Sequence, residues 1–147
     1  MSTDSRLAQI VDVDVTVLDL ADRDRLTVRL VGEPVGEWLA ITPEVGRVGS
    51  ERAQLTGRWT VTHRASGLNA AASCSWLRFA AAEQYAREAD ALGAEVWGRE
   101  DLTSRWFVSR AGAAARDALA TAIYHADRLD APAGHSQPEP AQPAEAA

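Results

Sequence analysis

The sequence predicts one α+β domain, in which an antiparallel sheet of about five strands is covered by two helices. In the first half of the chain, apolar side chains alternate with polar ones, which is the period of strands with one buried face. In the second half, apolar residues recur at helical spacing in two segments. Strands that cluster before helices favour separate sheet and helix layers. A chain of 147 residues is long enough to bury a core.

Each predicted strand is bounded by residues that favour turns. Valine alternates with aspartate and threonine in the first strand, and the polar turn Ala21–Asp24 leads into the second. Glycine and proline bound the third, and residues 43–57 show no period, which predicts a loop. The turn Ala65–Gly67 joins the last two strands into a hairpin. The predicted strands cover residues 10–20, 26–30, 38–41, 58–64 and 68–74.

Two helices follow the strands. The first is predicted to begin near Ser75, whose hydroxyl can cap it, and to end at Gly93, a left-handed C-terminal cap. The second covers about residues 113–129 and is stopped by Pro132. Residues 94–110 contain two tryptophans that must be largely buried, but strand and helix fit this segment equally well.

Composition sets the limits of the domain and its compartment. The domain is predicted over residues 9–130, and residues 131–147 are predicted to be a disordered tail because they hold four prolines and no large apolar side chain.

The lone Cys74 excludes an internal disulfide and indicates a reducing compartment. The start lacks a signal-peptide pattern, and there is no apolar run of membrane-spanning length. We therefore expect a soluble cytoplasmic protein without membrane contact.

The charge is unevenly distributed along the chain. The formal net charge is −6, yet residues 47–78 carry five arginines against one glutamate, a net charge of +4. All 15 basic residues are arginine, whose planar guanidinium binds carboxylate or phosphate through two parallel hydrogen bonds. An acidic protein repels polyanions at long range. The basic segment can nevertheless contact a few phosphates or an acidic protein surface.

The strand at 58–64 separates its side chains onto two faces. Trp59, Val61 and His63 share one face and are expected to pack on the first helix. The other face is expected to be exposed and carries Arg58, Thr60, Thr62 and Arg64, with Arg47, Arg52 and Arg78 at its rim. Such a face is either a solvated strand surface or a surface that binds nucleic acid through guanidinium and hydroxyl groups.

The residue patterns predict no catalytic, cofactor or metal site. We interpret His63 as a hydrogen-bonded core residue. Cys74 precedes a helix N-terminus, which can activate a thiol, but we interpret it as a small buried side chain. The hairpin register places residue 63 opposite 69 and residue 58 opposite 74, so His63 and Cys74 are too far apart to act together. Histidine and cysteine lack zinc-site spacing, and the aspartates at 12–24 lack the glycine and glutamate of a calcium loop.

One part of the chain resembles other proteins. The strand and turn G-R-W-T-V-T-H-R-A-S-G and the helix A-x-x-Y-A-R-E-A-D-A-L-G resemble a pattern in small uncharacterised proteins of actinobacteria and their mobile elements. The resemblance covers residues 57–97 and implies no established activity. The strand–strand–helix order is also similar to integrase-arm and related DNA-binding domains, and that resemblance implies that Arg58 and Arg64 face DNA.

These observations predict a non-enzymatic interaction or accessory protein, encoded by a mobile element or phage of a GC-rich bacterium. A protein partner is expected, and self-association through an exposed tryptophan or a sheet edge is one form of this hypothesis. The alternative is nucleic-acid binding through the face of the 58–64 strand. An enzyme is the least favoured interpretation, because the sequence shows no catalytic constellation.

Overall fold

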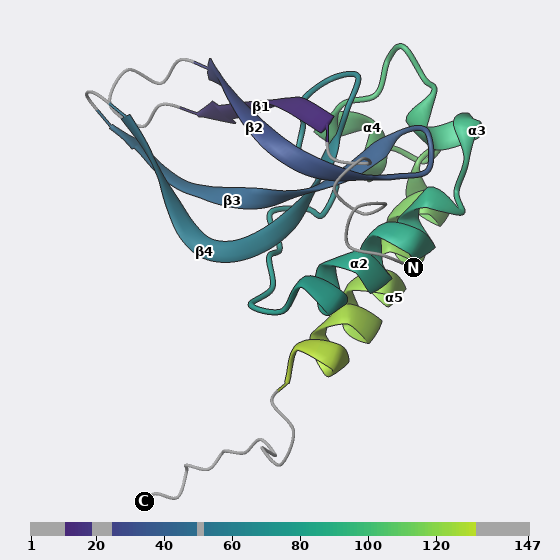
Figure 1. The fold of residues 1–147 in the computed structure, drawn as a ribbon. Coiled ribbons are helices and arrows are strands. Elements are labelled where there is room, and N and C mark those ends of the chain that lie inside the picture. The colour runs from purple at the N-terminus through teal and green to yellow at the C-terminus, as the bar shows by residue number, and fades with distance from the viewer. Residues whose placement is uncertain (1–10, 19–24, 50–51, 132–147) are drawn as a thin grey trace, which may run out of the picture.

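The computed structural model describes residues 11–18, 25–49 and 52–131 and confirms an α+β fold with an antiparallel sheet (Figure 1). The strands in these residues are β1 (Val11–Leu18), β2 (Arg25–Val35), β3 (Leu39–Gly49) and β4 (Arg52–His63). The helices are α2 (Phe79–Asp90), α3 (Ala94–Trp97), α4 (Ser104–Val108) and α5 (Ala113–Asp130). The predicted tail at 131–147 lies outside the described residues, apart from Ala131.

The sheet is strongly bent between its two hairpins. Its strand order is β1-β2-β3-β4, and β1 pairs with β2 along its whole length. In contrast, β2 pairs with β3 only from Glu33↔Ile41 to Val35↔Leu39. At the bend, a Cβ on Gly32 would lie 3.0 Å from the carbonyl oxygen of Ile41, so the absence of a side chain allows the strands to approach. The two hairpins consequently diverge, with β1–β2 above β3–β4 (Figure 1).

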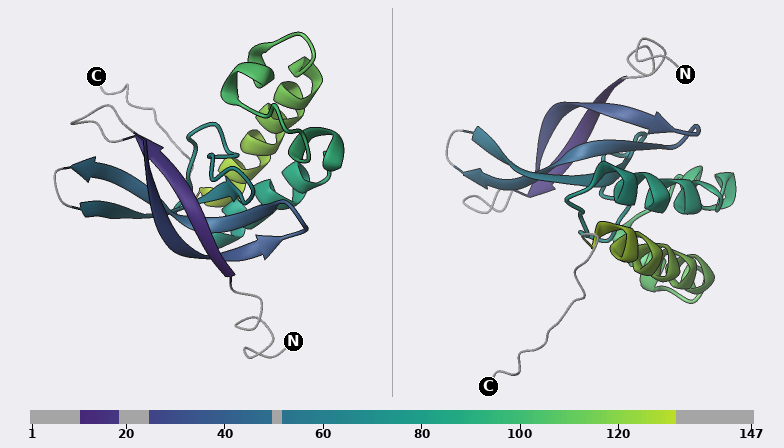
Figure 2. Two further views of the ribbon diagram at one scale, coloured as in Figure 1. Left: turned by 90° about the horizontal axis from the view of Figure 1, so that it is seen from above. Right: turned by 60° about the horizontal axis from the view of Figure 1, so that its bottom comes forward.

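This bend gives β3 two buried faces. Leu39 and Ile41 point toward the helices and join the main core, whereas Ala40 joins a smaller core with Val13 and Val15 of β1. On the helical side, α2 packs against β3 and β4, and α5 packs against α2 (Figure 2). The α2 side of the core is lined largely by alanines, whose small side chains allow close packing.

The predicted fifth strand is wrong. Residues 70–73 form turns, and in place of a strand ladder with β4 there are only isolated bridges, Thr62↔Asn69 within this segment and Trp59↔Trp76 just after it. The reason is local, because the side-chain oxygen of Asn69 accepts hydrogen bonds from the amides of Ala71 and Ser73 and so stabilises a turn. Ser73 also has a left-handed backbone with φ of 67°, which an extended strand cannot contain.

The predicted loop at 43–57 is also wrong, because β3 and β4 extend through most of it. Its glycines and proline occupy irregular positions of a long hairpin. The register shifts between Pro43 and Val45 and again between Val45 and Arg47, and Gly57 has φ of 85°. Bulges of this kind admit glycine within a strand. They also interrupt the regular edges that would otherwise add another strand.

The first helix begins later than predicted. Ser75 does not cap it, because α2 starts at Phe79 and the Ser75 hydroxyl accepts a hydrogen bond from Arg58 instead. The backbone amides just before α2 find their hydrogen-bond acceptor on another helix. The Asp130 carboxylate at the end of α5 accepts hydrogen bonds from the amides of Leu77 and Arg78. The second predicted helix is confirmed as α5, and the ambiguous segment 94–110 contains α3 and α4.

Candidate functional site

The structure does not form the exposed Arg/Thr face expected on the 58–64 strand. Thr60 and Thr62 are 4% and 1% exposed. The Thr62 hydroxyl lies 2.9 Å from that of Thr42, and the Thr60 hydroxyl donates to the carbonyl oxygen of Cys74 at 2.7 Å. The expectation is wrong because the bent sheet and the segment after β4 cover this side of the strand. Hydroxyl groups engaged in this way cannot contact a nucleic acid.

The arginines of the predicted site also do not gather on one surface. Arg58 is half-buried, and its guanidinium donates to the hydroxyl and carbonyl oxygens of Ser75, both at 2.9 Å. Arg64 is exposed just past the opposite end of the strand, roughly 20 Å away at the rise of extended chain. Arg78 is exposed just before α2. The side chains of Arg47 and Arg52 lie outside the described part of the structure.

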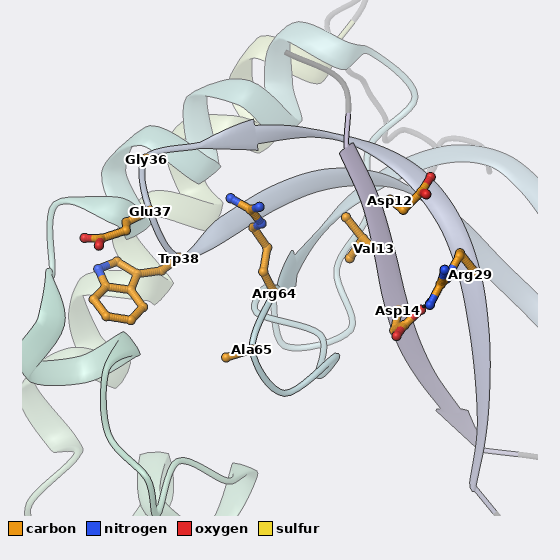
Figure 3. Close-up of a pocket in the computed structure, with 9 residues that line it drawn as sticks. All are labelled: Asp12, Val13, Asp14, Arg29, Gly36, Glu37, Trp38, Arg64 and Ala65. Carbon is orange, nitrogen blue, oxygen red and sulfur yellow. Dashed lines mark hydrogen bonds and ion pairs between the residues drawn. The ribbon is translucent and has the colours of Figure 1, made fainter. Parts of the chain in front are cut away.

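Arg64 instead faces a hollow of about 960 Å³ between three segments that are distant in sequence (Figure 3). One wall is the β1–β2 hairpin, the second is the turn between β2 and β3, and the third is the turn that follows β4. The side chain of Arg64 extends into the space between the Gly36–Trp38 turn and β1. The hollow is lined by Asp12, Val13, Asp14, Arg29, Gly36, Glu37, Trp38, Arg64 and Ala65.

Backbone hydrogen bonds hold these three segments together. The amide of Arg64 donates to the carbonyl oxygen of Trp38 at 2.8 Å, which joins the turn after β4 to the β2–β3 turn. The amide of Thr16 donates to the carbonyl oxygen of Gly67 at 2.8 Å, which joins the same turn to β1. Gly67 has φ of 77°, and a Cβ there would lie 2.6 Å from the carbonyl oxygen of Asp14. The shape of the hollow therefore depends on glycine at this contact.

The charged groups of the hollow fall into two sets. Arg29 and Asp14 form an ion pair at 2.9 Å across the β1–β2 ladder. The hydrogen bond and charge of Asp14, followed by the charge of Asp12, raise the pKa of Arg29 above its ordinary value. In contrast, the guanidinium of Arg64 makes no hydrogen bond or ion pair with any residue that the structure describes. The same is true of the Glu37 carboxylate.

His63 has a structural role, as predicted. It is 3% exposed, and its Nε2 lies 2.7 Å from the carbonyl oxygen of Trp97, so this nitrogen carries the proton. Its Nδ1 accepts from the hydroxyl of Ser66 at 2.7 Å, while that hydroxyl accepts from the amide of Leu68. Both ring nitrogens are thereby satisfied, and the imidazole joins the turn after β4 to α3.

Cys74 is not placed as an activated thiol. It is half-buried, and its burial, followed by the negative charge of Asp127, raises the pKa of the thiol. The helix after it begins five residues later, at Phe79, so the dipole of α2 does not act on it directly. The predicted hairpin register was also wrong, because the bridges are Thr62↔Asn69 and Trp59↔Trp76.

We expect Cys74 to react slowly with alkylating reagents. Because the thiolate is the reactive form and the thiol pKa is raised, the midpoint of the rate of reaction with iodoacetamide should lie above about pH 8.5, the value for an unperturbed cysteine. Mass spectrometry across a pH series gives the rate, and the same chain in urea is the reference. A midpoint below the urea value in the folded protein would contradict the structural role of this residue.

No group of three or more histidine, cysteine or acidic side chains is positioned to hold a metal ion within residues 11–18, 25–49 and 52–131. Among the helices that the structure describes, none has the length and apolar character to cross a membrane. Of the aspartates at 12–24, Asp12 and Asp14 are exposed on β1, and residues 19–24 lie outside the described part.

Comparison of the chain with protein-family models, with curated proteins and with solved structures gave no match. The hollow must therefore be interpreted from its own chemistry. Sequence reasoning identified Arg64 but missed its neighbours Glu37, Trp38 and Arg29. These residues lie on separate hairpins, and neither periodicity nor motif spacing connects them to Arg64.

Proposed function

We propose that this protein is a non-enzymatic interaction protein and that a protein partner binds at the hollow around Arg64. One observation carries the proposal: the guanidinium of Arg64 projects into a hollow of about 960 Å³ and has no ion-pair partner in the described part of the chain. Arginine combines charge, directional hydrogen bonds and a flat apolar surface, and it is enriched where proteins bind other proteins. The half-buried Trp38 also lines the hollow, and tryptophan is another residue enriched at binding hot spots.

The chemistry of the remaining residues supports binding rather than catalysis. The imidazole of His63 is enclosed and hydrogen-bonded at both nitrogens, and the thiol of Cys74 is held in its neutral form by burial. A nucleophile or general base requires a reactive group within reach of substrate. Neither side chain lines the hollow.

Charge supports a protein partner in preference to nucleic acid. Three acidic and two basic residues line the hollow, and the whole chain carries a net charge of −6. An acidic protein repels a phosphate backbone at long range. The buried hydroxyls of Thr60 and Thr62 also remove the polar contacts on which nucleic-acid binding by this strand depended.

We expect Arg64→Glu to remove specific partners from the proteins that co-purify with the full chain. The substitution reverses the charge at an exposed position, so the fold should be retained while the contact is lost. Quantitative mass spectrometry of tagged protein recovered from a native lysate is the measurement. Arg110→Glu is the matched control, because Arg110 is also exposed and lies outside the hollow.

The comparison between the two variants decides the proposal. Partners that are lost with Arg64→Glu and retained with Arg110→Glu support it. Equal recovery by both variants and by wild type would overturn it. A mobility shift of duplex or single-stranded DNA by the wild-type chain at low salt, removed by Arg58→Ala together with Arg64→Ala, would replace it with the nucleic-acid alternative.

A further inference from the structure

We infer that the hollow binds an extended segment of the partner protein, which adds to the sheet as a strand beside β1. This inference rests on the proposed function and names the mode of binding. Three features meet at one place: the outer edge of β1, the hollow that this edge borders, and the guanidinium of Arg64 that extends into it (Figure 3). In strand addition, hydrogen bonds between main chains supply the affinity.

β1 is an edge strand of the sheet, and one hydrogen bond shows which of its backbone groups face outward. In an antiparallel pair, residues that exchange hydrogen bonds with the partner strand alternate with residues whose N–H and C=O point away from it. The amide of Thr16 donates to the carbonyl oxygen of Gly67 in the turn after β4, so Thr16 points away from β2. By this alternation, the backbone groups of Asp12 and Asp14 also point outward, whereas those of Val13 face β2.

The turn after β4 covers only one end of this outer edge. Gly67 lies against the carbonyl oxygen of Asp14, since a Cβ on the glycine would be 2.6 Å from that oxygen. The amide of Asp14 and both backbone groups of Asp12 have no backbone partner among the residues that the structure describes. These two residues belong to the part of β1 that lines the hollow. Unpaired groups along a strand edge are a template for another strand, and here they border open space.

The surroundings of this edge favour a single segment over the sheet of a second copy. The turn after β4 closes the edge at Thr16, and the Gly36–Trp38 turn lies across the hollow from β1 (Figure 3). One extended chain can lie between these turns and β1, whereas a second folded sheet brought up to β1 would meet the turns. The free guanidinium of Arg64 then selects a segment with an acidic side chain, because a carboxylate can accept two hydrogen bonds from it.

The first test titrates a short peptide into the ¹⁵N-labelled full chain at low salt. The peptide is Thr-Val-Glu-Val-Thr, acetylated and amidated at its ends. We expect the amide protons of Asp12 and Asp14 to shift downfield and to exchange more slowly with solvent, because they gain acceptors. The amide of Val13, which faces β2, should change least. Arg64→Gln should raise the dissociation constant about two- to fivefold, the effect of an exposed ion pair, and Arg110→Gln should leave it unchanged.

The second test removes N–H groups from the predicted ladder. The peptide is N-methylated either at both valines or at the glutamate and the last threonine. Because alternate N–H groups of a strand point to opposite edges, one methylated peptide should bind as the parent does and the other about tenfold more weakly. In the protein, Asp12→Pro removes an outward N–H at an edge position that tolerates proline, and it should weaken binding. Asp12→Ala loses the same carboxylate, keeps the N–H and should bind as wild type does.

The opposite results overturn the inference. These are equal binding of the two methylated peptides, equal binding by Asp12→Pro and Asp12→Ala, or unchanged amide signals of Asp12 and Asp14. Slower exchange of these amides that grows with protein concentration, without peptide, would assign the edge to a second copy. Strand addition can also fail alone: if Arg64→Glu loses its partners from a lysate and Asp12→Pro retains them, the proposed function stands without it.

Discussion

Replacing Trp76 with alanine is expected to lower the free energy of unfolding by about 3–5 kcal/mol, the usual cost of removing a large buried aromatic side chain. Trp76 is 1% exposed, and its ring packs on that of Tyr85 with centroids 5.2 Å apart. Its indole N–H also donates to the Asp127 carboxylate at 2.8 Å, which joins the segment after β4 to α5. Because domains are stabilised by only about 5–15 kcal/mol, this loss removes a large share of the total stability.

Urea denaturation followed by far-UV circular dichroism measures this effect. Leu77→Ala is the control, because the neighbouring Leu77 is 61% exposed and its loss should cost less than about 0.5 kcal/mol. Trp76→Phe keeps an aromatic ring but loses the indole N–H. Its free energy of unfolding should therefore lie between those of Trp76→Ala and Leu77→Ala. If Trp76→Ala and Leu77→Ala had equal midpoints, Trp76 would not occupy the core position described here.

Gly67→Ala is expected to destabilise the protein by about 2–5 kcal/mol, combining the strain of a left-handed residue with overpacking. Gly67 has φ of 77°, and an added Cβ would lie 2.6 Å from the carbonyl oxygen of Asp14 and 2.8 Å from the hydroxyl oxygen of Thr16. Backbone cannot move aside as a flexible side chain does. The substitution should therefore separate the turn from β1 and distort the wall of the hollow.

Gly93→Ala separates the cost of backbone strain from the cost of overpacking. Gly93 has nearly the same backbone angle, with φ of 73°, but nothing lies within 4 Å of the position of an added Cβ. It should cost about 1–2 kcal/mol from strain alone. Amide exchange of Thr16, whose N–H donates to Gly67, should accelerate in Gly67→Ala and not in Gly93→Ala. Equal loss of stability in the two variants would mean that β1 does not contact this turn.

The local patterns of the sequence were sufficient for the fold class. Alternating valines predicted β1, and apolar residues at helical spacing predicted α5 to within a residue. Both signals depend on one element presenting one face to a core, so they can be read from neighbouring residues alone. They fail where this condition fails. The predicted fifth strand has suitable residues, but the side chain of Asn69 stabilises a turn there.

Long-range packing decided the functional surface. The sequence predicted that Thr60 and Thr62 lie on an exposed strand face, because a sheet with helices on one side leaves its other side to solvent. The bend at Gly32 reverses that conclusion, since it brings a second hairpin over β3 and buries both faces of the strand. A bend that depends on one glycine and three residue pairs between β2 and β3 leaves no periodic trace in the sequence.

The sequence by itself determined the α+β class, the position of α5, the hydrogen-bonded core role of His63 and the fact that every basic residue is arginine. The tertiary structure alone decided that Arg58 donates hydrogen bonds to Ser75 while Arg64 extends into a hollow between β1 and the Gly36–Trp38 turn. The physical reason is the range of the interactions. Hydrophobic periodicity and turn chemistry act within a few residues. The hollow instead forms where the β1–β2 hairpin, the β2–β3 turn and the turn after β4 are joined by backbone hydrogen bonds. These segments are distant in the chain, and no side-chain pattern records their backbone contacts.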